Sequence, residues 1–293
     1  MGDYVLTCDL ADIRFFFRNL PADAFNIFFR PFLARSGPVG ERCLIDVLGA
    51  NDALRALRSD QAWSFVQQNG CACVTGANPA GEVLWRMTGV APYEHLAFEW
   101  HPTAFEAMYR NEFYGMYGIV AILALVLRLV HLQGFVMHGS AQIVDGRAIL
   151  CTGPSGKGKS TISRLFDRCG VPVLTDERPL LRRREKETGP WFQVYGSPWP
   201  SSGNFVLNAS APLAKIYFLE HGSENVVEPL ARREAVLRLL DVSMVPWMDV
   251  AFFDPVIRTL EMLLDVAPCA ILRFRPDESV VGVVRRDVAR SSP

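Results

Sequence analysis

A glycine-rich stretch holds the residues of this chain that are best suited to phosphate chemistry. Gly153 is followed by four residues and then by Gly158-Lys159-Ser160, which matches the pattern G-x-x-x-x-G-K-[ST]. Glycines allow backbone angles that other residues avoid, so successive amide N–H groups can form a cradle for anionic oxygens. In this pattern the lysine binds the β- and γ-phosphates, and the serine hydroxyl binds Mg²⁺. The stretch therefore predicts a site for a nucleoside triphosphate.

The segments on either side of this loop must position it. Residues 147–151 predict a short buried strand, and residues 160–167 predict a helix with apolar Ile162, Leu165 and Phe166. A helix that begins near Lys159 points the positive end of its dipole at bound phosphates. With ATP as the expected ligand, the predicted binding residues are Gly153, Pro154, Ser155, Gly156, Lys157, Gly158, Lys159, Ser160 and Thr161.

Two acidic residues follow the next apolar segment. Residues 171–175 predict a buried strand, and Asp176 and Glu177 come directly after it. An acid at this place after a phosphate-binding loop serves as a second Mg²⁺ ligand or as a general base. The alternative is a charged surface turn. The apolar strand and the short spacing favour a functional role, for Asp176 more than for Glu177.

The composition narrows the class of protein. A formal net charge of -1 over 293 residues argues against a general nucleic-acid binder, which needs a basic excess. The seven cysteines are scattered, and Cys71 and Cys73 lack the further ligands of a zinc site, so free thiols in a reducing compartment are expected. Acidic residues near the N-terminus do not suit a secretory signal. The longest apolar run, 115–127, is shorter than the roughly 18 residues that indicate a membrane span. These features predict a cytoplasmic protein without a membrane span.

The chain is long enough for two domains. Residues 1–105 predict a smaller, strand-rich α+β domain, and residues 106–293 predict the catalytic domain. The first domain also contains many phenylalanines, which either form its core or dock a partner peptide; core is the more common use. These are Phe15, Phe16, Phe17, Phe25, Phe28 and Phe29.

The order of motifs from Met137 to Arg178 resembles the HPr kinase/phosphorylase family. Met137-His138-Gly139 precedes the loop by a short interval, and Asp176-Glu177-Arg178 follows the next apolar strand. The match is best to divergent HPr-kinase-like relatives, including the serine kinases found with lasso peptides and other ribosomally made peptides. The family usually has two aspartates where this chain has Asp176 and Glu177.

The resemblance implies a fold and an activity. The fold is α/β, with a P-loop core similar to HPr kinase and phosphoenolpyruvate carboxykinase and with a mixed, twisted sheet. The activity is ATP- and Mg²⁺-dependent transfer of the γ-phosphoryl group to a serine-type hydroxyl of a peptide or small protein. By position, Asp176 is the base, His138 assists, Lys159 binds phosphate, and Ser160, Glu177 and Asp176 are the metal ligands. Because HPr kinases form rings, a homo-oligomer is also expected.

Two alternatives remain open at this point. The acceptor could be a small molecule such as an amino acid or sugar, which a closed polar pocket would favour over an open groove lined by Trp199. The chain could instead be a regulator that binds nucleotide without transferring phosphate. The presence of Asp176 in addition to Lys159 and Ser160 argues against this second alternative, because nucleotide binding alone needs no base.

Overall fold

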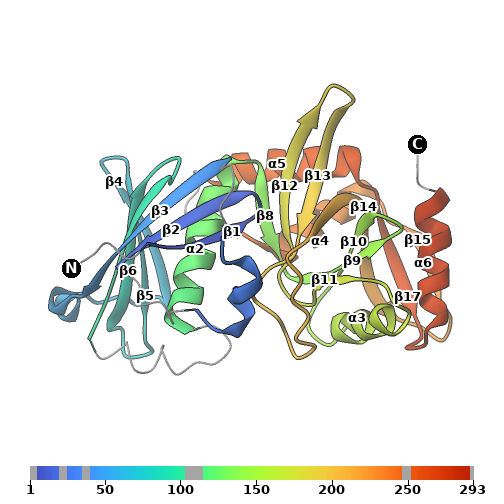
Figure 1. The fold of residues 1–293 in the computed structure, drawn as a ribbon, viewed down its shortest axis with the longest axis horizontal. Coiled ribbons are helices and arrows are strands. Elements are labelled where there is room, and N and C mark those ends of the chain that lie inside the picture. Colours follow the sequence, from blue (N-terminus) through green and yellow to red (C-terminus); the bar gives the residue numbers. More distant parts are fainter. Residues whose placement is uncertain (1–4, 20–24, 35–39, 103–114, 246–251, 291–293) are drawn as a thin grey trace. The chain divides into compact units, whose positions relative to one another are not determined.

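The computed structural model describes residues 5–19, 25–34, 40–102, 115–245 and 252–290. Within these ranges the chain is a mixed α/β protein with two sheets and a few helices (Figure 1). Its contacts divide it into two compact units, residues 1–131 with 246–253 and residues 132–245 with 254–293. The predicted domain boundary between residues 105 and 106 lies outside the described residues.

The first unit is built on one sheet. Within the described part of this unit the strands run in the order β1-β2-β3-β7-β6-β5-β4, with parallel pairing between β2 and β3 and between β3 and β7. They are β1 (Val5–Leu10), β2 (Ile13–Arg18), β3 (Glu41–Ala50), β4 (Trp63–Gln68), β5 (Cys71–Ala77), β6 (Val83–Val90) and β7 (His95–Trp100). The helices are η1 (Ile27–Phe32), η2 (Asp52–Ala56) and α2 (Gly115–His131).

The phenylalanines of the first unit serve its core. Phe15 and Phe17 are fully buried because β2 alternates inward and outward side chains, as a half-buried strand does. Phe29 is buried in η1 and stacks on Phe25, which in turn meets Phe17 edge to face. The interpretation of this aromatic cluster as core is therefore confirmed for these residues.

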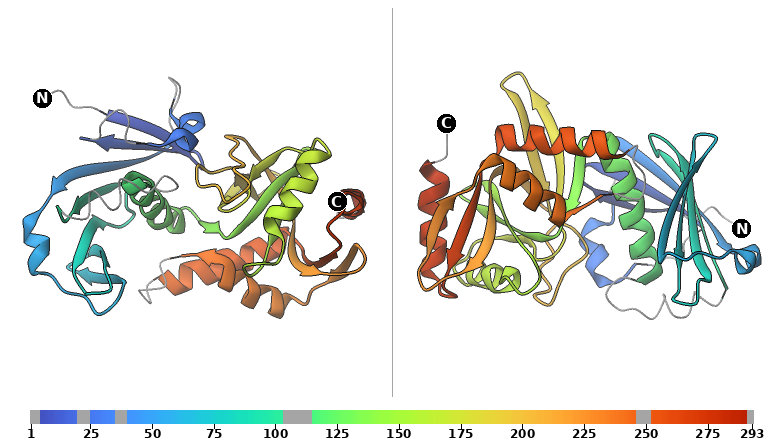
Figure 2. Two further views of the ribbon diagram at one scale, coloured as in Figure 1. Left: turned by 90° about the horizontal axis from the view of Figure 1, so that it is seen from below. Right: turned by 180° about the vertical axis from the view of Figure 1, so that it is seen from behind.

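The second unit is built on a larger mixed sheet, in which the described strands follow the order β11-β9-β10-β14-β13-β12-β8-β16. Strand β17 pairs in parallel with β14, and β15 pairs with β17. The strands are β8 (Gly134–Met137), β9 (Gly139–Val144), β10 (Arg147–Thr152), β11 (Val173–Thr175), β12 (Leu180–Lys186), β13 (Gly189–Tyr195), β14 (Ser210–His221), β15 (Val226–Pro229), β16 (Ser243–Met244) and β17 (Cys269–Phe274). The helices are α3 (Lys159–Arg168), α4 (Arg232–Val242), α5 (Phe253–Val266) and α6 (Ser279–Arg290), and α6 lies beside β15 (Figure 2).

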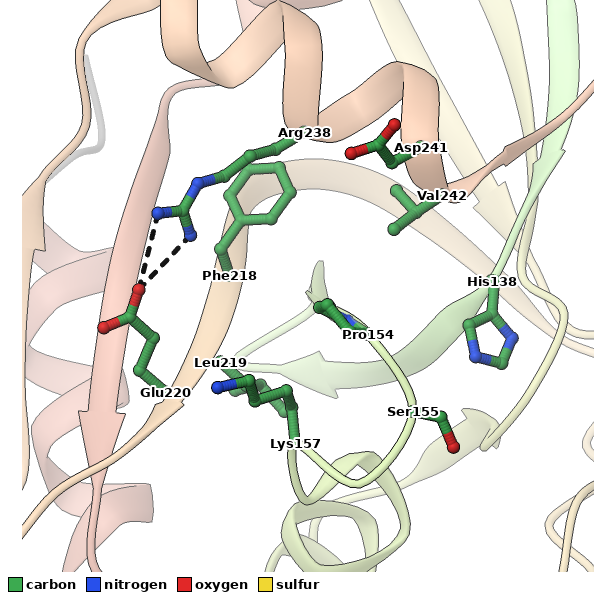
Figure 3. A pocket seen from close by; sticks show the side chains of 11 residues that line it. His138, Pro154, Ser155, Lys157, Phe218, Leu219, Glu220, Arg238, Asp241 and Val242 are labelled. Carbon is green, nitrogen blue, oxygen red and sulfur yellow. Dashed lines mark hydrogen bonds and ion pairs between the residues drawn. The ribbon is translucent and has the colours of Figure 1, made fainter.

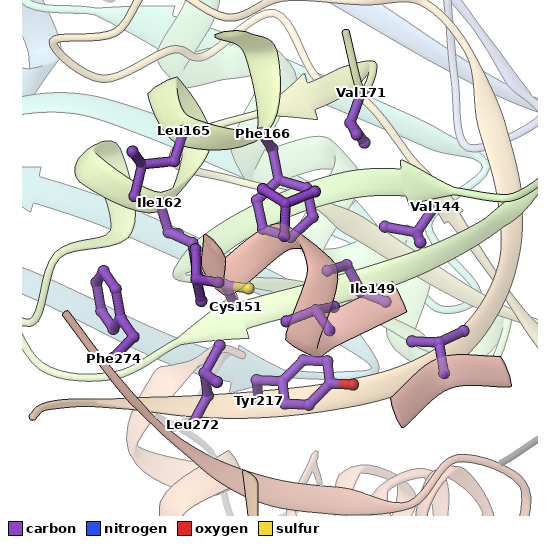
Figure 4. Packing of buried hydrophobic residues seen from close by; sticks show 14 of the residues in the cluster. Val144, Ile149, Cys151, Ile162, Leu165, Phe166, Val171, Tyr217, Leu272 and Phe274 are labelled. Atoms are coloured by element: carbon purple, nitrogen blue, oxygen red, sulfur yellow. The ribbon is translucent and has the colours of Figure 1, made fainter. Parts of the chain in front are cut away.

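A hydrophobic cluster fixes the glycine loop, residues 153–160, in the second unit. Helix α3 places Ile162, Leu165 and Phe166 against buried side chains of β10, β14 and β17 (Figure 4). Phe274, at the end of β17, belongs to the same cluster, and a Cβ atom at Gly158 would lie only 2.7 Å from its ring. Gly158 also has φ +92°, so both the close approach and the backbone angle require glycine there.

The predicted strand and helix on either side of the loop are confirmed as β10 and α3. Among the described residues, no helix combines the length and the apolar character that crossing a membrane requires.

Candidate active site

Lys159 points back into the loop that carries it. Its Nζ donates to Gly153 O at 2.8 Å and to Pro154 O at 3.1 Å, and the residue is 8% exposed. Burial lowers the pKa of Lys159, while the negative charge of Glu177 raises it in part. Two carbonyl oxygens of the loop therefore accept from the ammonium group of Lys159. An anionic ligand would bind this ammonium group more strongly than the two neutral carbonyls do.

The loop has the backbone angles of an anion cradle. Gly153, Gly156 and Gly158 all have positive φ values, and α3 begins directly after Gly158, which is its N-cap without a side-chain cap. The free amide groups of a helix N-terminus and the dipole of the helix both favour negative charge. Ser160 and Thr161 are half-buried in the first turn of α3, and Pro154 and Ser155 are exposed.

His138 lies between β8 and β9, where α4, β10 and the segment after β11 hold it. Its backbone N–H donates to Val242 O at the end of α4 at 2.7 Å, and its carbonyl accepts from Thr152 Oγ1 at the end of β10 at 2.6 Å. Its Nδ1 lies 3.2 Å from Glu177 Oε1. The structure thus brings the predicted residues His138 and Glu177 together.

Glu177 is held in its charged form. Burial raises the pKa of Glu177. The hydrogen bond from His138 and the positive charges of His138, Arg178 and Lys159 lower it by more, so the pKa of Glu177 lies below its ordinary value. The Glu177 side chain is 18% exposed. It is therefore an ionised carboxylate with access to solvent, in electrostatic contact with Lys159.

Asp176 has different surroundings from its neighbour Glu177. It is fully buried, and its two carboxylate oxygens accept from the backbone N–H groups of Ser201 at 2.9 Å and Gly203 at 2.8 Å. Burial raises the pKa of Asp176, while the amides of Ser201 and Gly203 oppose this change. A Cβ atom at Gly203 would lie 2.4 Å from Asp176 Oδ2, so this close contact requires glycine. Asp176 thus holds the 201–203 segment in place.

Trp199, which the sequence placed beside a possible peptide groove, is fully buried. It therefore lines no open surface. Among the described residues, no group of three or more histidine, cysteine, aspartate or glutamate side chains is arranged to hold a metal ion. The oxygen donors of Ser160 and Glu177 are the predicted metal ligands that are not fully buried.

A pocket of about 570 Å³ adjoins the loop (Figure 3). His138 and the loop residues Gly153, Pro154, Ser155 and Lys157 form part of its lining. The rest comes from the end of β14 and the last turns of α4, which the sequence analysis did not assign to a site: Phe218, Leu219, Glu220, Arg238, Asp241 and Val242. The amphipathic pattern of residues 232–240 predicts the helix, but nothing in that pattern indicates which of its residues face the loop.

No family model matches this chain, and no curated protein matches it. Among solved structures, the chain is similar to the HPr(Ser) kinase/phosphatase from Coxiella burnetii, with a TM-score of 0.29 and 11% sequence identity. The alignment covers 53% of this chain and 97% of that chain. A similarity at this level does not by itself indicate a function.

Proposed function

We propose that this chain is an ATP- and Mg²⁺-dependent kinase that transfers the γ-phosphoryl group of ATP to a hydroxyl group. One observation carries the proposal: His138, which is paired with Glu177, lines the same pocket as the first residues of the glycine loop. An acid–base pair and a phosphate-binding loop at one pocket are the equipment that phosphoryl transfer needs. A protein that only binds nucleotide has no use for the pair.

The loop fits a triphosphate. Its glycine angles, the N-terminus of α3 and the Lys159 ammonium all favour negative charge at the same place. Ser160 offers an oxygen ligand of the kind that Mg²⁺ prefers. When bound, Mg²⁺ would neutralise charge on the phosphate oxygens. We infer from the same features that this unit has a P-loop core of the HPr kinase type, as the motif order suggests.

The geometry favours Glu177 over Asp176 as the proton acceptor. A base must reach the acceptor hydroxyl directly or through one intermediary, and Asp176 is buried with both oxygens bound to backbone amides. Glu177 is ionised, reaches solvent and is oriented by His138. We therefore propose Glu177 with His138 as the acid–base pair and Asp176 as the residue that positions the 201–203 segment.

The acceptor is proposed to be a serine-type hydroxyl of a peptide or small protein, as the motif resemblance suggests. A small-molecule acceptor is the second candidate, and two observations favour it. The pocket at His138 has the size of small-molecule sites, which occupy about 300–1,000 Å³. In addition, Trp199 is buried and cannot line a groove for a peptide.

The test is mass spectrometry of the purified chain with Mg·ATP and both kinds of acceptor, serine peptides and small hydroxyl compounds. We expect one acceptor to gain the mass of a single phosphoryl group, and the Lys159→Ala variant to give no product. ATP that is bound but transferred to neither class would count against the kinase and support a regulator. Absence of ATP binding would refute the assignment of the loop itself.

A further inference from the structure

The far wall of the pocket carries a carboxylate that the phosphate chemistry does not use. From this wall we infer that the acceptor is a small hydroxyl compound with an ammonium group, which Asp241 binds. The inference rests on the proposed kinase activity. It takes the second candidate acceptor, a small molecule, in place of a peptide and narrows it to amino alcohols and hydroxy amino acids.

The pocket borders both the glycine loop and His138. Its lining includes His138, the partner of Glu177, and the loop residues Gly153 to Ser155 and Lys157, which lie across the pocket from α4 (Figure 3). Lys159 and Ser160, which would hold the phosphates and the metal, are not among its described lining residues. A molecule in this pocket would therefore meet His138, which pairs with Glu177, and the loop that is proposed to hold the triphosphate.

The other charges on the far wall are already paired. Glu220 accepts from Arg238 at 3.4 Å and also pairs with Arg273 at 3.4 Å. Arg238 is held by Glu234 as well, at 2.7 Å, and its guanidinium lies over the Phe218 ring at 5.6 Å. Arg238 and Glu220 therefore each lie beside an opposite charge.

Asp241 differs from these residues. It is exposed, and among the described residues no cation lies within ion-pair distance of it. It stands in the last turn of α4, where the helix dipole already places partial negative charge. A carboxylate at that end of a helix is unfavourable by itself, so the two negative charges together favour a cation in the pocket. Figure 3 shows Asp241 and His138 at the edge of the same open space.

The pocket between His138 and Asp241 is large enough for a small-molecule acceptor. Leu219 and Val242 contribute apolar surface, and the volume of about 570 Å³ lies within the range of small-molecule sites, so a small hydroxyl compound fits together with the phosphoryl group that it receives. In the reaction, the acceptor oxygen forms a bond to the γ-phosphorus and the bond from this phosphorus to the bridging oxygen breaks. ADP leaves with that electron pair, and the hydroxyl proton passes to Glu177.

The experiment compares two acceptors that differ at one group. L-Serine carries an ammonium where glycerate carries a hydroxyl, so the ratio of their kcat/KM values measures recognition of the cation. We expect a ratio of about ten or more for the full chain and a ratio near one for Asp241→Asn. Asp167→Asn, an exposed substitution on α3 outside the pocket, is the matched control and should keep the high ratio.

Three results would overturn the inference while leaving the kinase standing. They are equal use of glycerate and L-serine, an unchanged ratio in Asp241→Asn, and transfer to a serine peptide with blocked termini but to no free amine. Failure of the proposed function looks different, since the chain would then bind no ATP or transfer phosphate to no acceptor at all. Transfer to L-serine with the expected loss of selectivity in Asp241→Asn would support both proposals.

Discussion

The first unit and the glycine loop of the second unit hold buried charge in contrasting ways. In the first unit, Glu99 is 8% exposed and accepts from Arg86 and from Asn51 Nδ2. Arg128 is 3% exposed and donates to Glu41 and Glu94 at 2.7 and 3.2 Å. Each of these two buried charges lies beside an opposite charge, Glu99 beside Arg86 and Arg128 of α2 beside Glu41 and Glu94, which is the usual condition for burying charge.

At the glycine loop of the second unit, the charged side chains Lys159 and Glu177 have weaker partners than the paired charges of the first unit. Lys159 donates to loop carbonyls, and Glu177 meets a half-exposed histidine. Such groups can change partners when a ligand arrives, whereas the paired charges of the first unit cannot do so without loss of stability. A buried charge in a functional site therefore differs from a structural one in the kind of partner it has, more than in how deeply it is buried.

The sharpest way to test this comparison is to alter the two neighbouring acids of the second unit separately. Glu177→Gln should lower turnover by about 10²–10⁴-fold, the usual contribution of a general base, while ATP affinity stays within a few fold. Asp176→Asn should instead weaken the hold on the 201–203 segment, because an amide cannot accept from both backbone N–H groups in the same way. Hydrogen exchange at Ser201 and Gly203, measured beside steady-state turnover, separates the two effects.

This assignment of roles can fail in a definite way. If Glu177→Gln stays active, and Asp176→Asn loses turnover with the amides of Ser201 and Gly203 still protected, then Asp176 is the base. The role that the motif resemblance implies for Asp176 would then hold, in place of the one that its burial suggests.

The next largest effect concerns Lys159. Loss of its charge-assisted contact with phosphate should cost about 1.5–3 kcal/mol, which is about ten- to a hundredfold in ATP affinity. Calorimetric titration of Lys159→Ala with Mg·ATP measures this effect. The control is Lys186→Ala, because Lys186 is exposed on β12. Lys215→Ala is unsuitable because Lys215 forms an ion pair with Asp287 at 2.7 Å. If Lys159→Ala binds Mg·ATP with normal affinity, the glycine loop is not the phosphate-binding site.

The smallest effect tests the first unit. Glu99→Gln should leave ATP affinity unchanged and should destabilise the sheet locally by about 1–3 kcal/mol, since Arg86 and Asn51 lose a charged acceptor. Native-state hydrogen exchange should accelerate at β6 and β7. A change in ATP affinity without faster exchange there would contradict the structural role of these charges and erase the contrast between the units.

Part of the site could be predicted without the structure because its residues are close in sequence. The glycine loop, Lys159 and Ser160 follow from local backbone requirements, and β10 and α3 follow from the periodicity on either side. Local methods do not detect strand β2, because its Phe15 to Phe17 run hides the alternation of buried and exposed positions. Strand β4, with exposed Trp63 and Val66, gave little signal for the same local methods.

The sequence by itself determined the phosphate-binding pattern, the acidic pair after a buried strand and the position of His138 ahead of the loop. Only the tertiary structure decided which acid faces the site, because Asp176 is turned inward by amides 25 and 27 positions away in the chain. It also decided that the end of α4 lines the pocket, through the contact of His138 N with Val242 O. Local sequence encodes which dihedral angles and periodicities are allowed, whereas the partner of a buried carboxylate depends on contacts between segments that are far apart in the chain.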